Sequence, residues 1–148
     1  MRQPKRDIKR VFVHCTGTRP SATVESVKQG FRRLGWANPG YHFLVDQWGV
    51  IHTLLPIDRI ANGVRGYNAT AVHVAYIGGL NARRQPADTR TVAQARSLRA
   101  AVRALLMDYP GAQVLGHRDI SPDLNGNGIV DPWERIKECP CFDVATDL

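Results

Sequence analysis

The sequence lacks long apolar runs and has few cysteines. Its first ten residues are polar and basic, the apolar run that follows is too short for a signal peptide, and no segment approaches transmembrane length. We therefore expect a protein that is made in the cytoplasm without a signal peptide and that does not span a membrane. The three cysteines are an odd number, which favours thiols or metal ligands over a framework of disulfides.

Internal repeats and low-complexity segments are also lacking, and the composition is that of a folded protein. With 148 residues, 43% of them hydrophobic and 22% charged, the chain is long enough to bury one core. We predict a single domain over residues 1–148 that begins with a basic N-terminal arm at 1–10. Acidic residues are few, since 13 stand against 20 lysines and arginines, for a net charge of +7. This excess favours a polyanionic partner, either nucleic acid or a bacterial wall polymer, or it serves solubility alone.

Hydrophobic periodicity predicts an alternation of strands and helices. The predicted elements are, in order, a strand at 11–13, a helix at 21–36, a hairpin of strands at 41–45 and 50–55, a strand at 71–77, a helix at 91–109 and a strand at 113–117. A capping box at Thr91 and Gln94 begins the second helix. After Arg118 we expect a long irregular tail. This order predicts the α/β or α+β class, with a central mixed β-sheet flanked by helices.

Two of the five histidines, His14 and His117, each end an apolar strand just before loop residues, where functional sites are commonly built. Cys139 precedes Pro140, which favours extended backbone, so Lys137 and Cys139 should point into one space. Two neutral imidazoles and one thiolate are a ligand set typical of catalytic zinc, with the fourth position left for water. Spacing alone leaves open the alternative that the three residues are unrelated.

The other two cysteines fit less well as the third ligand. Cys15 adjoins His14 on a predicted strand, so its side chain should face the opposite way, into the core. Cys141 lies two residues after Cys139 and remains an alternative second thiol.

Four segments, taken in order, resemble the successive motifs of the type 2 N-acetylmuramoyl-L-alanine amidases, which include the phage amidase lysozymes and the peptidoglycan recognition proteins. They are residues 12–16, 40–43, 116–119 and 137–143, and the resemblance runs from about residue 11 to residue 144. It implies that His14, His117 and Cys139 are zinc ligands and that Tyr41 and Lys137 are catalytic side chains. A cysteine as third ligand resembles the phage and recognition-protein branches, whereas the cytosolic wall-recycling amidases of this fold carry an aspartate there. Cys141 departs from the family, which usually has a small residue at that place.

The resemblance implies a zinc hydrolase that cleaves the amide bond between N-acetylmuramic acid and L-alanine in peptidoglycan, as a phage-type endolysin. Zinc lowers the pKa of its bound water to about 7. Lys137 would stabilise the oxyanion, and Tyr41 would orient the water or the carbonyl. Such an enzyme would stay in the host cytoplasm until it is released to the cell wall, and we expect a monomer.

Other functions are open on the sequence alone. One is a cytosolic amidase that recycles muropeptides, and another is a non-catalytic peptidoglycan-recognition module, against which Cys139 argues. The last alternative is a protein that binds nucleic acid or a polymerase. No segment resembles a nucleic-acid-binding motif, so we expect no nucleic-acid partner.

A second metal motif lies between His117 and Cys139. Residues 123–134 match the twelve-residue calcium loop, with Gly128 at its sharp turn. The predicted calcium ligands are Asp123, Asn125, Asn127, Ile129, Asp131 and Glu134. Pro122 precludes a regular helix before the loop, so we expect a solitary calcium loop; the alternative is a surface turn without an ion. A bound ion would order the segment that carries Lys137 and Cys139.

Overall fold

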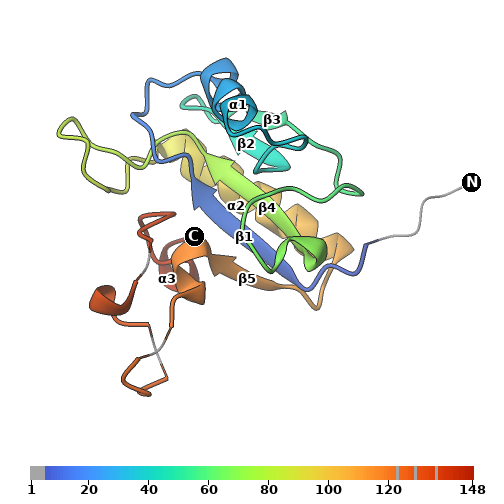
Figure 1. The fold of residues 1–148 in the computed structure, drawn as a ribbon, viewed down its shortest axis with the longest axis vertical. Coiled ribbons are helices and arrows are strands. Elements are labelled where there is room, and N and C mark those ends of the chain that lie inside the picture. The colour runs from blue at the N-terminus through green and yellow to red at the C-terminus, as the bar shows by residue number, and fades with distance from the viewer. Residues whose placement is uncertain (1–5, 123, 129, 136) are drawn as a thin grey trace, which may run out of the picture.

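The computed structural model describes residues 6–122, 124–128, 130–135 and 137–148, and within them five strands form one mixed sheet (Figure 1). The order across the sheet is β3-β2-β4-β1-β5. The strands are β1 (Arg10–Cys15), β2 (Phe43–Val45), β3 (Ile51–Thr53), β4 (Ala71–Tyr76) and β5 (Gln113–Gly116). All pair in parallel except β3, which is antiparallel to β2. The predicted mixed sheet is therefore confirmed.

The helix α2 (Val92–Asp108) begins at its predicted capping box, whereas α1 (Val24–Arg33) is shorter than the predicted 21–36 because Thr23 caps its first turn. In α1 the Thr23 hydroxyl accepts the Ser26 N–H at 3.1 Å, and in α2 the Thr91 hydroxyl accepts the Gln94 N–H at 3.0 Å. These capping bonds satisfy N–H groups that the first turn of a helix leaves without partners. None of the helices among the described residues is long and apolar enough to cross a membrane.

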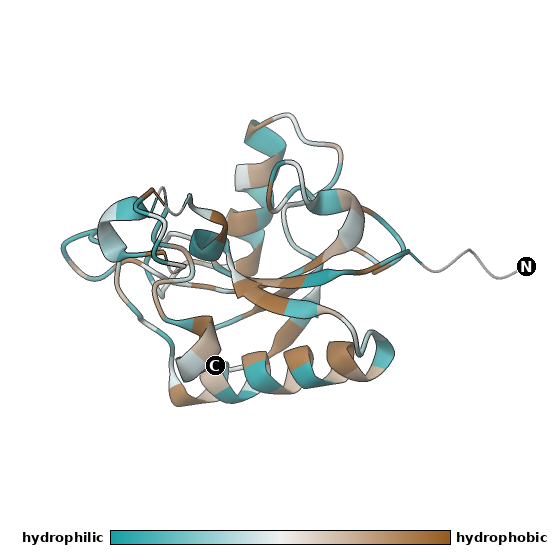
Figure 2. Cartoon of the chain, turned by 90° about the horizontal axis from the view of Figure 1, so that it is seen from below, coloured by the Kyte–Doolittle hydropathy of each residue, from teal (hydrophilic) through white to brown (hydrophobic). Residues whose placement is uncertain are grey.

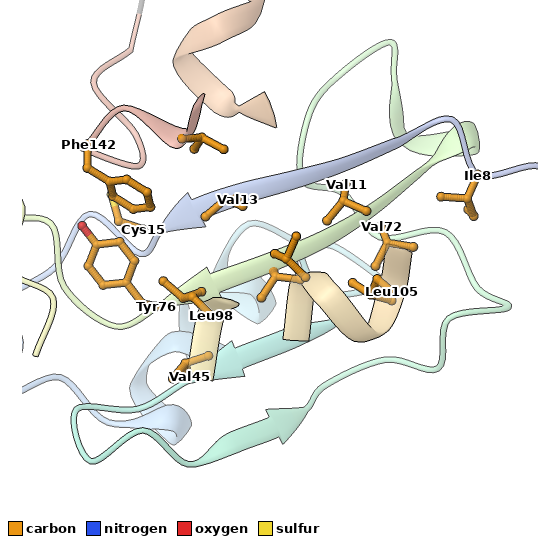
Figure 3. Close-up of a cluster of buried hydrophobic side chains, with 13 residues drawn as sticks. Ile8, Val11, Val13, Cys15, Val45, Val72, Tyr76, Leu98, Leu105 and Phe142 are labelled. Carbon is orange, nitrogen blue, oxygen red and sulfur yellow. The ribbon is translucent and has the colours of Figure 1, made fainter. Parts of the chain in front are cut away.

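The two faces of the sheet carry different side chains. Every second residue of β1 and β4 packs under α2, and Figure 3 shows this core, which includes Val11, Val13, Cys15, Val72, Tyr76, Leu98 and Leu105. Figure 2 shows the long helix α2 along one side of the sheet, and its buried residues are Gln94, Leu98, Val102 and Leu105. Because side chains alternate along a strand, His14 and His73 lie together on the opposite face, which α1 covers in part. As predicted, Cys15 faces the core.

The structure corrects the prediction at the end of β5. The strand ends at Gly116, and His117 begins a 3-10 turn, η2 (His117–Ile120), instead of ending the strand. The Asp119 carboxylate accepts the Gly116 N–H at 2.7 Å, and this local bond closes the turn.

The tail after Arg118 is also less irregular than predicted. It contains a second short turn, η3 (Pro132–Glu134), and a one-turn helix, α3 (Val144–Asp147), in addition to the single turn η1 (Asn68–Thr70) elsewhere in the chain. Val144 and Phe142 are buried in the core under α2, which gives this part of the tail its order.

The described part of the basic N-terminal arm belongs to the fold. Ile8 is buried in the core, and the Arg6 guanidinium donates hydrogen bonds to the carbonyls of Ile57 at 2.9 Å, Asn68 at 2.7 Å and Ala71 at 2.8 Å. Arg6 therefore ties the loop between β3 and β4 to the sheet. Residues 1–5 lie outside the described residues.

We predict that Arg6→Met lowers the free energy of unfolding by about 2–4 kcal/mol, because hydrogen bonds from a charged donor contribute about 1.5–3 kcal/mol each and are not additive. Urea denaturation measures this difference. The matched control is Arg103→Met on the exposed face of α2, which should change stability by no more than about 0.5 kcal/mol. Equal effects for the two variants would contradict a structural role for Arg6.

Candidate metal centre and groove

The ligand atoms of His14, His117 and Cys139 all lie within 4.8 Å of one another. His14 is in β1, His117 begins η2 directly after β5, and Cys139 comes from the loop before α3. Since β1 and β5 are neighbouring parallel strands, their carboxyl ends meet at one edge of the sheet. The structure thus brings together the three residues that the sequence selects. It is the one such group of His, Cys, Asp and Glu found among the described residues.

Backbone contacts hold Cys139 in place. The Arg118 N–H donates to the Cys139 carbonyl at 2.8 Å, and the Cys15 N–H donates to the Cys139 Sγ at 3.2 Å. The Cys139-Pro140 peptide bond is cis, and the Tyr76 hydroxyl donates to the Pro140 carbonyl at 2.7 Å. These contacts leave the Cys139 Sγ 3.7 Å from Nδ1 of His14.

Both histidines of the group are neutral near pH 7. Burial lowers the pKa of His14 well below its usual value, and the nearby His73, His117 and Lys137 lower it further. Burial, and then the charge of Lys137, lowers the pKa of His117 to about 4. A neutral imidazole is the form that binds a metal, so the chemistry of this donor set fits a metal ion.

A groove of about 410 Å³ opens beside the three ligands. Its walls include both predicted catalytic side chains, Tyr41 and Lys137. The Tyr41 ring lies 5.2 Å from the His14 ring, and its hydroxyl donates to the Cys15 carbonyl at 3.2 Å. Burial, and then Cys139 and Cys15, raises the pKa of Tyr41 well above its usual value, so the phenol keeps its proton. The far wall is aromatic, with the rings of Phe31 and Trp36 stacked at 5.6 Å.

The structure distinguishes Cys139 from the other two thiols. Cys141 is not in the ligand group; its Sγ lies 3.9 Å from the Cys15 Sγ and 3.6 Å from the Gly79 carbonyl. A hydrogen bond with Cys139, and to a lesser degree burial, raises the pKa of Cys15 to about 12. A hydrogen bond with Cys15 is the main cause that raises the pKa of Cys141. Both thiols therefore keep their protons, and the alternative of Cys141 as second thiol ligand is not supported.

Sequence reasoning missed His73, whose Nδ1 lies 2.8 Å from Nε2 of His14. The signal in the sequence was that His73 lies inside an apolar strand, in which every second side chain faces the same side of the sheet. In the structure His73 faces the side that carries His14. The register that places Phe12 beside His73 across β1 and β4 is a tertiary feature that the sequence pattern does not contain.

The calcium hypothesis gains no support from the described residues. Asp123 and Ile129, two of its six ligands, lie outside them. The buried Glu134 carboxylate accepts the backbone N–H groups of Leu124, Asn125 and Asp131. The Asp131 carboxylate accepts the side-chain amides of Asn125 at 3.0 Å and Asn127 at 2.9 Å. These carboxylates thus bond to other groups of the loop.

Buried histidines also predict how stability depends on pH. Burial lowers the pKa of His42 to about 4, with a further decrease from Arg6. The unfolded chain takes up this proton near pH 6.5 and the folded chain only near pH 4. Stability is therefore full above pH 6.5 and falls by about 1.4 kcal/mol per pH unit for one such group as the pH drops toward 4.

Urea denaturation of the metal-free protein between pH 7 and pH 4.5 tests this prediction. His42→Asn removes the titrating ring, so the slope of unfolding free energy against pH should decrease by about 1.4 kcal/mol per pH unit, the contribution of one proton. An unchanged slope would show that His42 titrates alike in the two states.

An open groove with two neutral imidazoles and a thiol at its floor is typical of metal-dependent hydrolases. The comparisons with known proteins agree with this class. The family model described as N-acetylmuramoyl-L-alanine amidase matches residues 4–140, and the chain belongs to that family. The predicted family and the predicted amidase activity are confirmed.

Among known proteins, the chain is 30% identical over 142 residues to the endolysin of Klebsiella phage KP32, covering 95% of this chain and 85% of that protein. It is 29% identical over 136 residues to the endolysin of Escherichia phage T7, covering 90% and 81%. Solved structures with this fold include the N-acetylmuramoyl-L-alanine amidase LysCS from Clostridium intestinale, with a TM-score of 0.72, 24% identity and coverage of 93% and 77%. PGRP-LB from Drosophila has a TM-score of 0.65, 21% identity and coverage of 94% and 81%.

Proposed function

We propose that this chain is a zinc-dependent N-acetylmuramoyl-L-alanine amidase that acts as a phage-type endolysin on peptidoglycan. The observation that carries the proposal is that His14, His117 and Cys139 meet at the floor of a groove lined by Tyr41 and Lys137. Endolysin relatives that align with nearly the whole chain support the biological setting. The bond that we propose is cleaved is the amide between N-acetylmuramic acid and the L-alanine of the stem peptide.

Zinc is the metal that this donor set fits best, because two imidazoles and one thiolate form a three-ligand catalytic site. When bound, zinc acts as a Lewis acid and makes a water molecule nucleophilic near neutral pH. Two neutral histidines and a thiol that receives the Cys15 N–H are available to hold it.

Tyr41 and Lys137, the two predicted catalytic side chains of the groove, have different roles in this proposal. Lys137 is exposed at the groove wall, and its charge is close enough to lower the pKa of both His14 and His117. We assign to it the stabilisation of negative charge on the substrate carbonyl oxygen. Burial keeps the Tyr41 phenol protonated, and we assign to its hydroxyl the orientation of the water or of the substrate carbonyl, for which it would exchange its present bond to the Cys15 carbonyl.

Digestion of purified peptidoglycan by the purified protein tests this function. We expect new amino groups of L-alanine, no new reducing sugars, and about one zinc ion per chain by metal analysis. New reducing ends would instead show a glycosidase and overturn the proposal. Activity on intact sacculi supports an endolysin, whereas activity on soluble muropeptides alone would identify a recycling amidase.

Calcium binding at residues 123–134 is a proposal that rests on the sequence pattern alone. It predicts that calcium, added to metal-stripped protein after zinc is restored, raises the melting temperature or the activity. Magnesium at the same concentration is the control, because it prefers a smaller octahedral site. If calcium changes neither quantity, the loop is a turn without an ion.

A further inference from the structure

A second buried histidine lies directly behind the candidate ligand His14. Nε2 of His14 and Nδ1 of His73 are 2.8 Å apart, and both side chains are almost fully buried. The two residues come from β1 and β4, neighbouring parallel strands in the middle of the sheet (Figure 1). The other nitrogen of His14, Nδ1, faces Cys139 at 3.7 Å. The two nitrogens of one ring thus serve two different neighbours.

The position of His73 is closely fixed. Its ring stacks on Phe12 at 5.5 Å with an interplanar angle of 10°, and lies parallel to the His42 ring at 6.0 Å. The backbone N–H of His73 donates to the ring Nδ1 of His42 at 3.0 Å. A Cβ at residue 63 would lie 2.3 Å from Nδ1 of His73, so only glycine leaves room for the ring there. A ring held in this way can set the orientation of its neighbour.

Stability alone does not account for a histidine at this place. Nε2 of His73 is buried and has no hydrogen-bond partner among the described residues. A buried polar atom without a partner lowers stability, and an apolar side chain would avoid that loss. The hydrogen bond to His14 is therefore the feature that distinguishes His73 from an apolar residue.

We propose that His73 is a positioning residue that fixes the proton of His14 on Nε2, so that the lone pair of Nδ1 is directed at the metal. This inference rests on the zinc site proposed above. A ligating nitrogen must be free of its proton, so the proton of His14 must sit on Nε2 and be donated to Nδ1 of His73. The other arrangement, with His73 as donor, would place a proton on the nitrogen that faces Cys139. Metal-bound histidines commonly donate their second N–H to a partner in this way.

Three variants test the inference through zinc affinity, measured by competition with a chelator of known strength. His73→Leu removes the acceptor, and its zinc affinity should fall about 10- to 100-fold. His73→Asn places an oxygen acceptor near the position of Nδ1 and should recover most of that loss. Val74→Ala is the control, because Val74 is buried on the same strand but faces the core under α2; its zinc affinity should match that of the unmodified protein.

Each outcome bears on a different claim. If the unmodified protein binds no zinc, the proposed function fails and this inference fails with it. If it binds zinc and His73→Leu binds it within about threefold, the positioning role alone is overturned. An Asn variant as weak as the Leu variant would overturn the acceptor role in favour of packing.

Nitrogen NMR of the unmodified zinc-loaded protein gives a test that does not depend on how the variants fold. His14 should show a protonated Nε2 coupled through the hydrogen bond to His73, and a metal-bound Nδ1. The reverse assignment of the two nitrogens would overturn the inference.

Discussion

Cys139→Ala is expected to remove both zinc and peptidoglycan hydrolysis. Cys139 supplies the only thiol in a group of three candidate ligands, and the two remaining imidazoles leave the site one donor short. Loss of a residue that only contacts a metal ligand lowers metal affinity by up to about 100-fold, so loss of a ligand itself should lower zinc affinity by more than that. A catalytic metal ion contributes several kcal/mol of transition-state stabilisation, and about 1.36 kcal/mol corresponds to a factor of ten in rate. Loss of the proposed zinc should therefore lower the rate at least about a thousandfold.

Cys141→Ala is the matched control for this prediction. It removes a thiol two residues away that lies outside the ligand group and contacts Cys15. Zinc content by metal analysis and release of stem peptides should both remain near those of the unmodified protein. A Cys139→Ala protein that keeps its metal and its full lytic rate would contradict the zinc assignment.

Lys137→Met should lower the turnover rate by about 100- to 1,000-fold, which is the usual loss for one donor to an oxyanion. Lys137 is exposed on the groove wall and is not one of the three candidate ligands, so the variant should fold and bind zinc like the unmodified protein. The loss should fall on kcat with little change in KM, because the charge on the carbonyl oxygen develops only in the transition state.

Lys9→Met is the control for charge. It also removes one positive charge, but Lys9 is an exposed residue that precedes β1 and pairs with Asp7 at 3.9 Å. Its rate should equal that of the unmodified protein. If Lys137→Met retains a rate within a few-fold of normal, Lys137 is a surface charge and the oxyanion has another partner.

Local sequence patterns predicted the elements that local interactions determine. The capping box at Thr91 and Gln94 placed the start of α2, because its hydrogen bonds join residues three apart. The apolar segments that lead into His14 and His117 indicated the edge of the sheet where the site lies. The pattern alone left open whether the two histidines meet, and the neighbouring parallel strands β1 and β5 bring them together.

The features that the sequence did not reveal depend on contacts between distant segments. The pairing of His73 with His14 follows from the register of β1 and β4, which alternation alone does not set. The role of Arg6 likewise depends on carbonyls more than fifty residues away in the chain. The 3-10 turn at His117 was missed for a different reason, since one short bond from Asp119 outweighed the strand pattern.

The spacing of the candidate ligands has a consequence for synthesis. His14 is in the first strand and Cys139 is nine residues before Leu148, with η2 contributing His117 between them. A chain still growing on the ribosome has no third ligand until residue 139 has emerged and folded back onto β1. If the proposed zinc site is correct, partial translation products and fragments that lack residue 139 would therefore be inactive, even where their sheet has already formed.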